Sequence, residues 1–290
     1  MRIVTRADWD GLVCAALLRF VENIDSIKFT EPGEFQSGAL TITSNDIIAN
    51  LPYRDGCGMW FDHHLSNKID HDFEGAWWVA PSAARVIYEH YNIEKTHNLT
   101  ELLEITDRID AAQLTLEEVK HPRGYILASM TIEGKRLEDE DYWLRLIDLI
   151  AENNLTKLMN DPIVNKNCYT YQKLNKEFGI AILNNSRLEG NVLITDFRGI
   201  WHGEPGNRFL AYTLFPSCNI WVKASDHPND PKLSHITAGH SIFNRTSNTV
   251  IGELMAKYGG GGHRGAGTCR PPKEDSDRVF AEVVEASLER

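Results

Sequence analysis

Short apolar runs alternate with segments of helical spacing over the first ninety residues. Residues 2–5 form a strand-like run, and residues 11–23 follow directly with apolar side chains at helical spacing. Further strand-like runs cover residues 26–30, 39–44, 58–61 and 76–80, and residues 81–92 begin with Pro-Ser and have the amphipathic spacing of a helix. Strands that alternate with helices predict an α/β fold whose sheet is mostly parallel and has helices beside it.

The pattern becomes helical after residue 95 and returns to strands near residue 190. Helices are predicted over residues 98–110, 140–151 and about 165–187, and the last would suit a connector between domains. Strand-like runs follow at 191–197, 219–225 and 234–241, and a helix is expected over 247–259. We therefore expect one domain over residues 1–188, connector helix included, and a smaller α/β domain over residues 189–290.

The composition is that of a soluble globular protein. Of 290 residues, 42% are hydrophobic and 24% charged, and no apolar run reaches the length of about 18 residues that a membrane span needs. The N-terminus enters a strand-like run without a signal peptide, so we expect a cytoplasmic protein and no membrane partner. Five scattered cysteines without a CxxC pair predict neither a disulfide framework nor a thiolate zinc site.

The net charge of −11 lies entirely in the first two-thirds of the chain. Residues 1–190 hold 19 basic and 30 acidic side chains, whereas residues 191–290 hold 11 of each. Such an acidic body argues against nonspecific binding of duplex nucleic acid through a broad basic face. It leaves room for an anionic substrate that metal ions and a few arginines hold locally.

Carboxylates follow two of the predicted strands. Asp8 and Asp10 stand where the first strand gives way to the first helix, and Asp46 follows a later β-rich run. Ligands of open α/β sheets bind at the carboxyl ends of the strands, and hard cations such as Mg²⁺ or Mn²⁺ favour oxygen ligands. Each of these aspartates could instead be a helix cap or a solvated turn residue.

Asp62, His63 and His64 end a third strand. Adjacent residues of an extended chain point to opposite sides, so one imidazole can bind a metal while the other faces the substrate. Asp107 and Asp110 stand one turn apart on a predicted helix, and one of them could complete the site. Four or five carboxylates with one or two histidines are what two hard cations about 3.5–4 Å apart require.

A glycine run near the C-terminus offers a different chemistry. Gly259–Gly262 precede His263 and Arg264, and glycines permit close approach of the backbone and can expose N–H groups to an anion. The run is neither a Walker A loop nor a dinucleotide-binding fingerprint, because no Lys-Ser/Thr follows it and a helix precedes it. Arg245 could add a phosphate contact. The alternative is a flexible glycine turn.

Together these motifs resemble the DHH/DHHA1 phosphoesterase family, which includes RecJ-type exonucleases, nanoRNase/pAp phosphatases and exopolyphosphatase-related proteins. "ADWDG" is similar to its first motif, Asp46 to its second, "DHH" at 62–64 to its third and Asp107 to its fourth. "GGGGHRGAG" is similar to the glycine-rich signature of the C-terminal DHHA1 domain. The resemblance covers essentially the whole chain, with five motifs in the family's order.

The resemblance implies a DHH metal-binding catalytic domain, a DHHA1 substrate-binding domain and an active site in the cleft between them. It implies two metal ions, usually Mn²⁺, with Mg²⁺ or Co²⁺ as alternatives. The implied metal ligands are Asp8, Asp10, Asp46, His63 and Asp107, with Asp46 bridging. Asp62 would support the site and His64 would sit near the scissile phosphate. The implied substrate contacts are Gly260, Gly261, Gly262, His263 and Arg264, with Arg245.

One position departs from the family pattern. Many members have a histidine ligand just before the first motif, and this chain has Val-Thr-Arg-Ala at residues 4–7. Arg6 cannot bind a metal in its charged form, so the occupancy of one metal position is in doubt. Arg6 could contact phosphate instead.

The function that the sequence predicts is hydrolysis of a phosphoester by a metal-activated water, with His64 protonating the leaving oxygen. Expected substrates are short single-stranded oligonucleotides or small nucleotides such as pAp, and a second copy of the chain is an expected partner. The alternatives are a polyphosphate or pyrophosphate hydrolase and a non-catalytic nucleotide-binding protein. The sequence does not choose among RNA, DNA, pAp, linear dinucleotides and polyphosphate.

Overall fold

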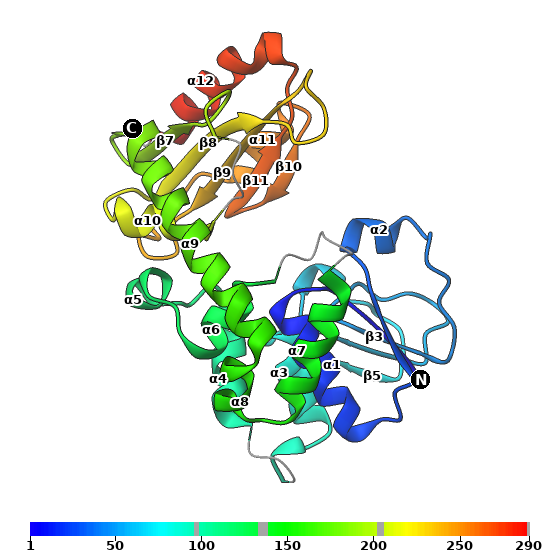
Figure 1. Cartoon of the computed structure of the whole chain (residues 1–290). Coiled ribbons are helices and arrows are strands. Elements are labelled where there is room, and N and C mark those ends of the chain that lie inside the picture. The colour runs from blue at the N-terminus through cyan, green and yellow to red at the C-terminus, as the bar shows by residue number, and fades with distance from the viewer. Residues whose placement is uncertain (96–98, 133–138, 202–205, 289–290) are drawn as a thin grey trace. The chain divides into compact units, whose positions relative to one another are not determined.

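The computed structural model describes residues 1–95, 99–132, 139–201 and 206–288, which form two compact units (Figure 1). The first unit comprises residues 1–114 and 122–169, and the second comprises residues 115–121 and 170–290. The division falls inside the long helix α9 (Pro162–Asn185), and the boundary expected near residue 188 lies just beyond the end of that helix. The division of labour between a catalytic and a substrate-binding domain stays a prediction.

The sheet of the first unit is parallel throughout, with the strand order β2-β1-β3-β4-β5. Its strands are β1 (Arg2–Thr5), β2 (Ser26–Phe29), β3 (Asp46–Ala49), β4 (Met59–Asp62) and β5 (Gly75–Trp77). The chain moves from β1 to one side to form β2 and then to the other side to form β3. The order therefore reverses between β1 and β3, and ligands of such sheets bind at the carboxyl ends of the strands beside this reversal.

Helix α1 (Trp9–Val21) is buried along most of its length. It packs against α3 (Ala83–His90), α4 (Thr100–Asp110) and α7 (Glu140–Ala151), so its apolar residues are covered on more than one side. Its first turn follows β1 closely: a Cβ at Gly11 would lie 2.3 Å from the carbonyl oxygen of Arg6, so a side chain there would clash with the strand end. The remaining helices of this unit are α2 (Pro32–Gln36), α6 (Gly124–Ser129) and α8 (Leu155–Asn160).

The second unit is built on a mixed sheet with the order β10-β11-β9-β8-β7-β6. Strands β7 and β8 pair in parallel, and all the other pairs of neighbouring strands in this sheet are antiparallel. The strands are β6 (Ser186–Glu189), β7 (Val192–Asp196), β8 (Ile220–Asp226), β9 (Ser234–His240), β10 (Gly261–His263) and β11 (Ala266–Cys269). One core cluster joins the sheet to α11 (Ile251–Ala256) and α12 (Ser276–Ser287), and another joins it to α9 and α10 (Leu210–Leu214). Helix α5 (Leu116–Lys120) packs on α10.

The predicted α/β class, the mostly parallel first sheet and the smaller second α/β unit are confirmed. The strand expected over residues 39–44 is wrong, because β3 forms at Asp46–Ala49 instead. In the segment before β3, the Thr41 carbonyl accepts from the Arg2 side chain and the Thr43 amide donates to the Asp46 carboxylate, so these groups do not join the sheet. Among the described residues, every helix is too short or too polar to cross a membrane.

The start of α9 generates a stability prediction. Asp161 accepts the backbone N–H groups of Ile163 and Val164, and the Arg145 guanidinium lowers the pKa of its carboxyl. Asp161→Ala should lower the free energy of unfolding at pH 7 by about 1 kcal/mol for the lost cap alone. Because the folded-state pKa is lowered, the stabilisation is present above the unfolded pKa of about 3.9 and is lost as pH falls through the folded value.

Urea unfolding of the wild type and Asp161→Ala at pH 7 and at pH 3 measures this effect. Asp148→Ala is the matched control, because Asp148 is largely exposed in its pair with Arg19 and such surface pairs contribute little. A difference between wild type and Asp161→Ala that is as large at pH 3 as at pH 7 would contradict the electrostatic part of the prediction.

Candidate metal centre

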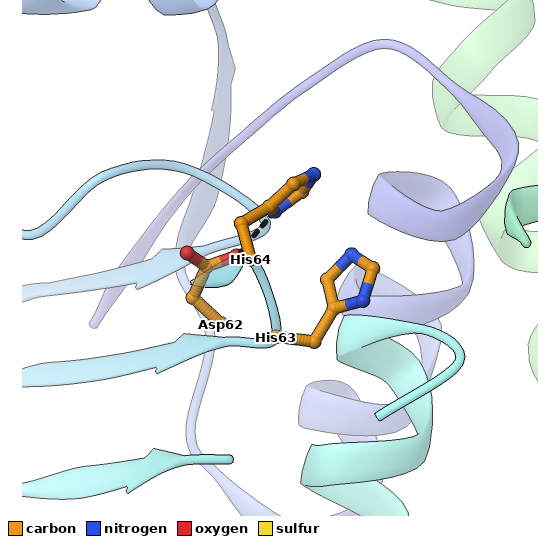
Figure 2. A group of neighbouring side chains, drawn as sticks. All are labelled: Asp62, His63 and His64. Carbon is orange, nitrogen blue, oxygen red and sulfur yellow. Dashed lines mark hydrogen bonds and ion pairs between the residues drawn. The ribbon is translucent and has the colours of Figure 1, made fainter. Parts of the chain in front are cut away.

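The Asp-His-His stretch lies at the carboxyl end of β4 (Figure 2). Asp62 is the last residue of the strand and is completely buried. The His64 ring turns back toward Asp62 and is bonded to it, whereas no bond joins the His63 ring to either residue. The two imidazoles therefore have different partners, although their ring centroids are 4.2 Å apart.

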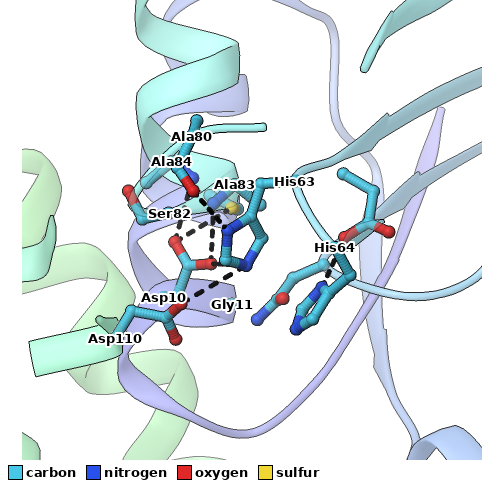
Figure 3. Close-up of polar contacts among 12 residues, drawn as sticks. Asp10, Gly11, His63, His64, Ala80, Ser82, Ala83, Ala84 and Asp110 are labelled. Atoms are coloured by element: carbon cyan, nitrogen blue, oxygen red, sulfur yellow. Dashed lines mark hydrogen bonds and ion pairs between the residues drawn. The ribbon is translucent and has the colours of Figure 1, made fainter. Parts of the chain in front are cut away.

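A hydrogen bond to the backbone fixes the proton of the His63 ring on Nδ1 and leaves Nε2 unprotonated. Its Nδ1 lies 3.0 Å from the carbonyl oxygen of Ala80, and a carbonyl can only accept, so Nδ1 carries the hydrogen. The Nε2 atom then has a lone pair, and it lies 3.3 Å from Asp110 Oδ2 and 3.9 Å from Asp10 Oδ2 (Figure 3). Nε2 is buried and has no hydrogen-bond partner within the described part of the chain.

Asp10 is positioned by the start of helix α3. Its carboxylate, 2% exposed, accepts the backbone N–H groups of Ala83 and Ala84 at 2.9 Å each. The N-terminus of a helix favours negative charge, so α3 holds the carboxylate both by hydrogen bonds and by its dipole. Oδ1 also accepts from the Cys14 thiol at 3.8 Å, so Oδ2, the oxygen that faces His63, is the one with a lone pair left for a further ligand.

Three acceptor atoms therefore converge from three elements: Asp10 on α1, His63 after β4 and Asp110 at the end of α4. One donor atom of each lies within 4.8 Å of the others. That spacing fits ligands around a divalent cation, which binds histidine nitrogen and carboxylate oxygen at about 2.0–2.2 Å. Two carboxylates and a lone pair that face one another need a positive charge between them, and the residues present fit a bound metal ion.

The electrostatics of the carboxyls agree with this need. Burial, together with the charges of Asp110 and Asp8, raises the pKa of Asp10 well above its usual range. Burial raises the pKa of Asp110 as well, the charge of Asp8 adds to this increase, and nearby cationic groups such as Arg6 oppose it. A raised carboxyl pKa means that the site favours a bound positive charge, which either a proton or a metal ion can supply.

Asp62 and His64 form a hydrogen-bonded pair beside this centre. His64 Nδ1 lies 2.8 Å from Asp62 Oδ1, and Asn67 donates to the other carboxylate oxygen at 2.6 Å. The hydrogen bond from Asp62 raises the pKa of His64 above its usual value. The pair therefore favours the imidazolium form, which can donate a proton from Nε2. Each oxygen of Asp62 accepts one hydrogen bond, and we assign Asp62 to holding His64. Asp62, His63 and His64 also offer ligand atoms within 4.8 Å of one another, so they form a second group that could hold a metal ion, and it shares His63 with the first.

Asp8 and Arg6 lie at the carboxyl end of β1. Asp8 caps α1 by accepting the Gly11 N–H at 2.9 Å, and its second oxygen lies 3.0 Å from Arg6 Nη1. The side chain of Asn50, which follows β3, donates to Asp8 at 3.0 Å. Asp8 is thus beside the metal centre, but both of its oxygens already have partners.

The structure does not bring Asp46 to this site. Asp46 is the first residue of β3 and so lies at the amino end of the sheet, where the Arg2 guanidinium binds it at 2.6 and 2.9 Å. The residue that β3 places at the carboxyl end is Asn50. Burial alone would raise the pKa of Asp46, and the hydrogen bonds from Arg2 and Thr43 lower it instead. Asp46 therefore forms a structural ion pair with Arg2.

Asp107 is also engaged elsewhere. Its carboxylate accepts from the Ser82 hydroxyl at 2.6 Å and from Arg85 at 2.6 and 2.9 Å, and the residue that faces His63 is Asp110. Ser82 in turn caps α3 by accepting the Arg85 N–H. Asp107 thus stabilises the helix start that holds Asp10, and Asp110 replaces it in the candidate metal centre.

The glycine run forms the edge of the second sheet. Gly261–His263 make up β10, and a Cβ at Gly260 or Gly262 would lie within 2.2 Å of a carbonyl oxygen of β11, so close packing requires glycine there. His263 and Arg264 are exposed at the hairpin turn, and Arg245 is exposed in the loop after β9. Their role in substrate binding stays a prediction.

The sequence reasoning missed Asn50 and Asn67 and chose Asp107 over Asp110. A signal for Asn50 exists: it follows the apolar run Ile47–Ala49, so a strand drawn there would have placed Asn50 at the carboxyl edge. The choice between Asp107 and Asp110 has no such signal, because both stand on one helix a single turn apart.

The chain is similar to solved structures of known proteins. No family model and no curated protein matches the chain. Among solved structures, the pGpG-specific phosphodiesterase PggH from Vibrio cholerae is 37% identical, with a TM-score of 0.86 over 98% of each chain. The exonuclease RecJ bound to manganese has 13% identity and a TM-score of 0.55 over 100% of this chain and 90% of its own, which shows a shared fold.

The metal centre predicts opposite results for two aspartates one turn apart on α4. Asp110→Asn should weaken Mn²⁺ binding at least about tenfold, because it removes a charged ligand. Asp107→Asn should leave Mn²⁺ affinity within a few-fold of the wild type, since that carboxylate binds Ser82 and Arg85. Isothermal titration calorimetry with Mn²⁺ measures both, and a larger loss for Asp107→Asn would contradict the assignment.

Asp46 should matter for stability and not for metal binding. Asp46→Asn removes the charge that pairs with Arg2 and should lower the free energy of unfolding by about 1–3 kcal/mol. Its Mn²⁺ affinity should equal that of the wild type, because β3 holds residue 46 at the amino end of the sheet. Urea unfolding and calorimetry test the two parts, and a strong loss of Mn²⁺ affinity in a folded variant would return Asp46 to the metal site.

Proposed function

Because the chain belongs to the DHH/DHHA1 phosphoesterase family, we propose that it is a metal-dependent phosphodiesterase that hydrolyses short linear oligonucleotides, with the dinucleotide pGpG as substrate. The family follows from identity of 37% over nearly the whole of both chains. The substrate proposal is taken from the protein that shares this identity. It is narrower than the oligonucleotides and small nucleotides that the sequence suggests.

The observation that carries the proposal is the buried Nε2 atom of His63 between two carboxylates. This atom is an acceptor, as are the oxygens of Asp10 and Asp110 that face it. A divalent cation, Mn²⁺ or Mg²⁺, would satisfy all three, and when bound it would polarise a phosphate and lower the pKa of a water. Arrangement and chemistry thus agree with hydrolysis of a phosphoester.

His64 is the proposed proton donor. In the reaction, water adds to phosphorus, the bond from phosphorus to the ribose oxygen breaks, and that oxygen needs a proton. The hydrogen bond from Asp62 raises the pKa of His64, so the imidazolium is available near neutral pH. Asp62 and Asn67 fix the ring orientation, because Asp62 binds Nδ1 and Asn67 binds the other oxygen of Asp62. Cleavage of pGpG in this way gives two molecules of GMP.

The glycine hairpin of the second unit is the proposed site for other phosphates of the substrate. His263 and Arg264 are exposed at its turn, and the glycines bring backbone N–H groups close to the surface. The acidic first unit offers no broad basic face for a duplex, which supports a short single-stranded substrate.

The activity prediction concerns His64. The wild type should convert pGpG to GMP in the presence of Mn²⁺ and lose this activity with a chelator. His64→Asn should lower kcat by about 10²–10⁴-fold while Mn²⁺ affinity changes little, because the imidazole gives a proton and is not a ligand. His71→Asn is the matched control, since His71 is an exposed histidine in the loop between β4 and β5.

A substrate panel separates the proposal from its alternatives. Chromatography of reactions with pGpG, pAp, a five-nucleotide RNA, polyphosphate and pyrophosphate shows which compounds are consumed. Release of orthophosphate from polyphosphate with pGpG untouched would support the polyphosphate hydrolase. No turnover of any compound, with binding of pGpG retained, would support the non-catalytic nucleotide-binding protein.

A further inference from the structure

The carboxyl ends of β1, β2 and β3 carry a second polar cluster, formed by Arg6 and Asp8 after β1, Glu31 after β2 and Asn50 after β3. It adjoins the metal centre, since the charges of Arg6 and Asp8 act on Asp110. The cluster differs from the metal centre in its charges. The metal centre combines two carboxylates with an acceptor nitrogen, whereas this cluster contains a permanent cation, the Arg6 guanidinium, between Asp8 and Glu31 at 3.0 and 3.6 Å.

Asp8 has no free oxygen in this cluster. Oδ1 accepts from the Gly11 N–H at 2.9 Å and from Asn50 Nδ2 at 3.0 Å, and Oδ2 pairs with Arg6 Nη1. A metal ion that used Asp8 would have to displace the guanidinium and would then lie beside its positive charge. Among the described residues, two groups could hold a metal ion, Asp10 with His63 and Asp110 and Asp62 with His63 and His64; both contain His63, and neither contains Asp8.

Asn50 also keeps the negative charge beside Asp8 low, because its side chain is neutral. It is 2% exposed and adopts a φ of 56°, so its side chain is confined. Its amide group donates to Asp8, which fixes its orientation, because the reversed amide would set two acceptor oxygens against each other. A carboxylate at this position would face Asp8 as a like charge and would call for a cation. The neutral amide does not.

Arg6 is equipped to do more than neutralise Asp8. Its side chain is 32% exposed, and its Nε atom is buried without a hydrogen-bond partner in the part of the chain that the structure describes. A guanidinium binds phosphate oxygens through paired N–H donors and cannot lose its charge near neutral pH. It can therefore present positive charge to an anion from the β1 side of the site.

We propose that the Arg6 guanidinium, supported by Asp8 and Asn50, takes the place of a second metal ion, so that the chain binds one divalent cation, at Asp10, His63 and Asp110. The proposal rests on the proposed function, in which a bound cation and a phosphate meet at this site. It departs from the two ions that the family resemblance implies. Arg6 then binds the phosphate and stabilises the charge that develops on it during hydrolysis.

The test counts metal ions and does not depend on turnover. Wild-type protein is dialysed against saturating Mn²⁺, the bound metal is measured per chain by atomic absorption, and the electron paramagnetic resonance spectrum is recorded. We expect one ion per chain and the six-line spectrum of isolated Mn²⁺. Two ions per chain, or the spectrum of a magnetically coupled Mn²⁺ pair, would overturn the proposal without any variant being made.

The double variant Arg6→Ala/Asn50→Asp asks whether these two residues exclude the second ion. It frees Asp8 and adds a carboxylate at the end of β3, so the bound metal should rise from one to two ions per chain and the coupled spectrum should appear. Arg19→Ala is the matched control, because it removes the same charge from the exposed side of α1 and should stay at one ion. A folded double variant that stays at one ion would overturn the role of Arg6 and Asn50.

The same samples separate this inference from the proposed function. A wild type that binds one ion and hydrolyses none of the compounds in the substrate panel would refute the phosphodiesterase and leave the metal count standing. A wild type that hydrolyses pGpG with two bound ions would refute the inference and leave the phosphodiesterase standing.

Discussion

A single hydrogen bond decides the character of the site. The Ala80 carbonyl accepts from His63 Nδ1, and a carbonyl cannot donate, so the proton is fixed on that nitrogen. The Nε2 lone pair must then face Asp10 and Asp110, which are acceptors as well. Had the ring carried its proton on Nε2, the three groups could satisfy one another. With Nδ1 fixed, only a cation or extra protons can, and this need for positive charge shapes the rest of the first unit.

The scaffold explains why two aspartates of α4 do different work. Asp10 is held by the first N–H groups of α3, so α3 must begin at a fixed place. Ser82 caps that helix, and Asp107 binds both Ser82 and Arg85, which ties the start of α3 to α4. Asp110, one turn further, is left to face His63. Asp107 therefore helps to hold Asp10 through the start of α3, whereas Asp110 faces His63 as a proposed ligand.

Much of this could be predicted from the sequence, and the failures have physical causes. The alternation of β-rich runs and helices predicted the α/β class, and the rule that ligands gather at strand ends predicted that Asp10 and His63 lie close together, as they do; their role as metal ligands stays a prediction. The error at Asp46 came from the β-rich run at 39–44, whose threonines bind Arg2 and Asp46 with their backbone groups and stay out of the sheet. Periodicity alone cannot show such side-chain competition. Nor can it tell Asp107 from Asp110, because that depends on where Arg85 of another helix lies.

Within a strongly acidic chain, the end of β4 lacks positive charge, whereas the ends of β1 and β3 contain it. At the end of β4, the carboxylates of Asp10 and Asp110 face the acceptor nitrogen of His63, so a cation would stabilise the three groups. At the ends of β1 and β3 the guanidinium of Arg6 and the amide of Asn50 satisfy Asp8 from within the chain. An anionic substrate would be repelled by the first unit as a whole, with its excess of carboxylates. In the proposed function it would approach where positive charge is concentrated: at a cation bound to His63 and its carboxylates, at Arg6 and at the protonated His64. The fixed proton of His63, which leaves Nε2 for a cation, and the permanent charge of Arg6 are the two features on which this proposed anion site depends.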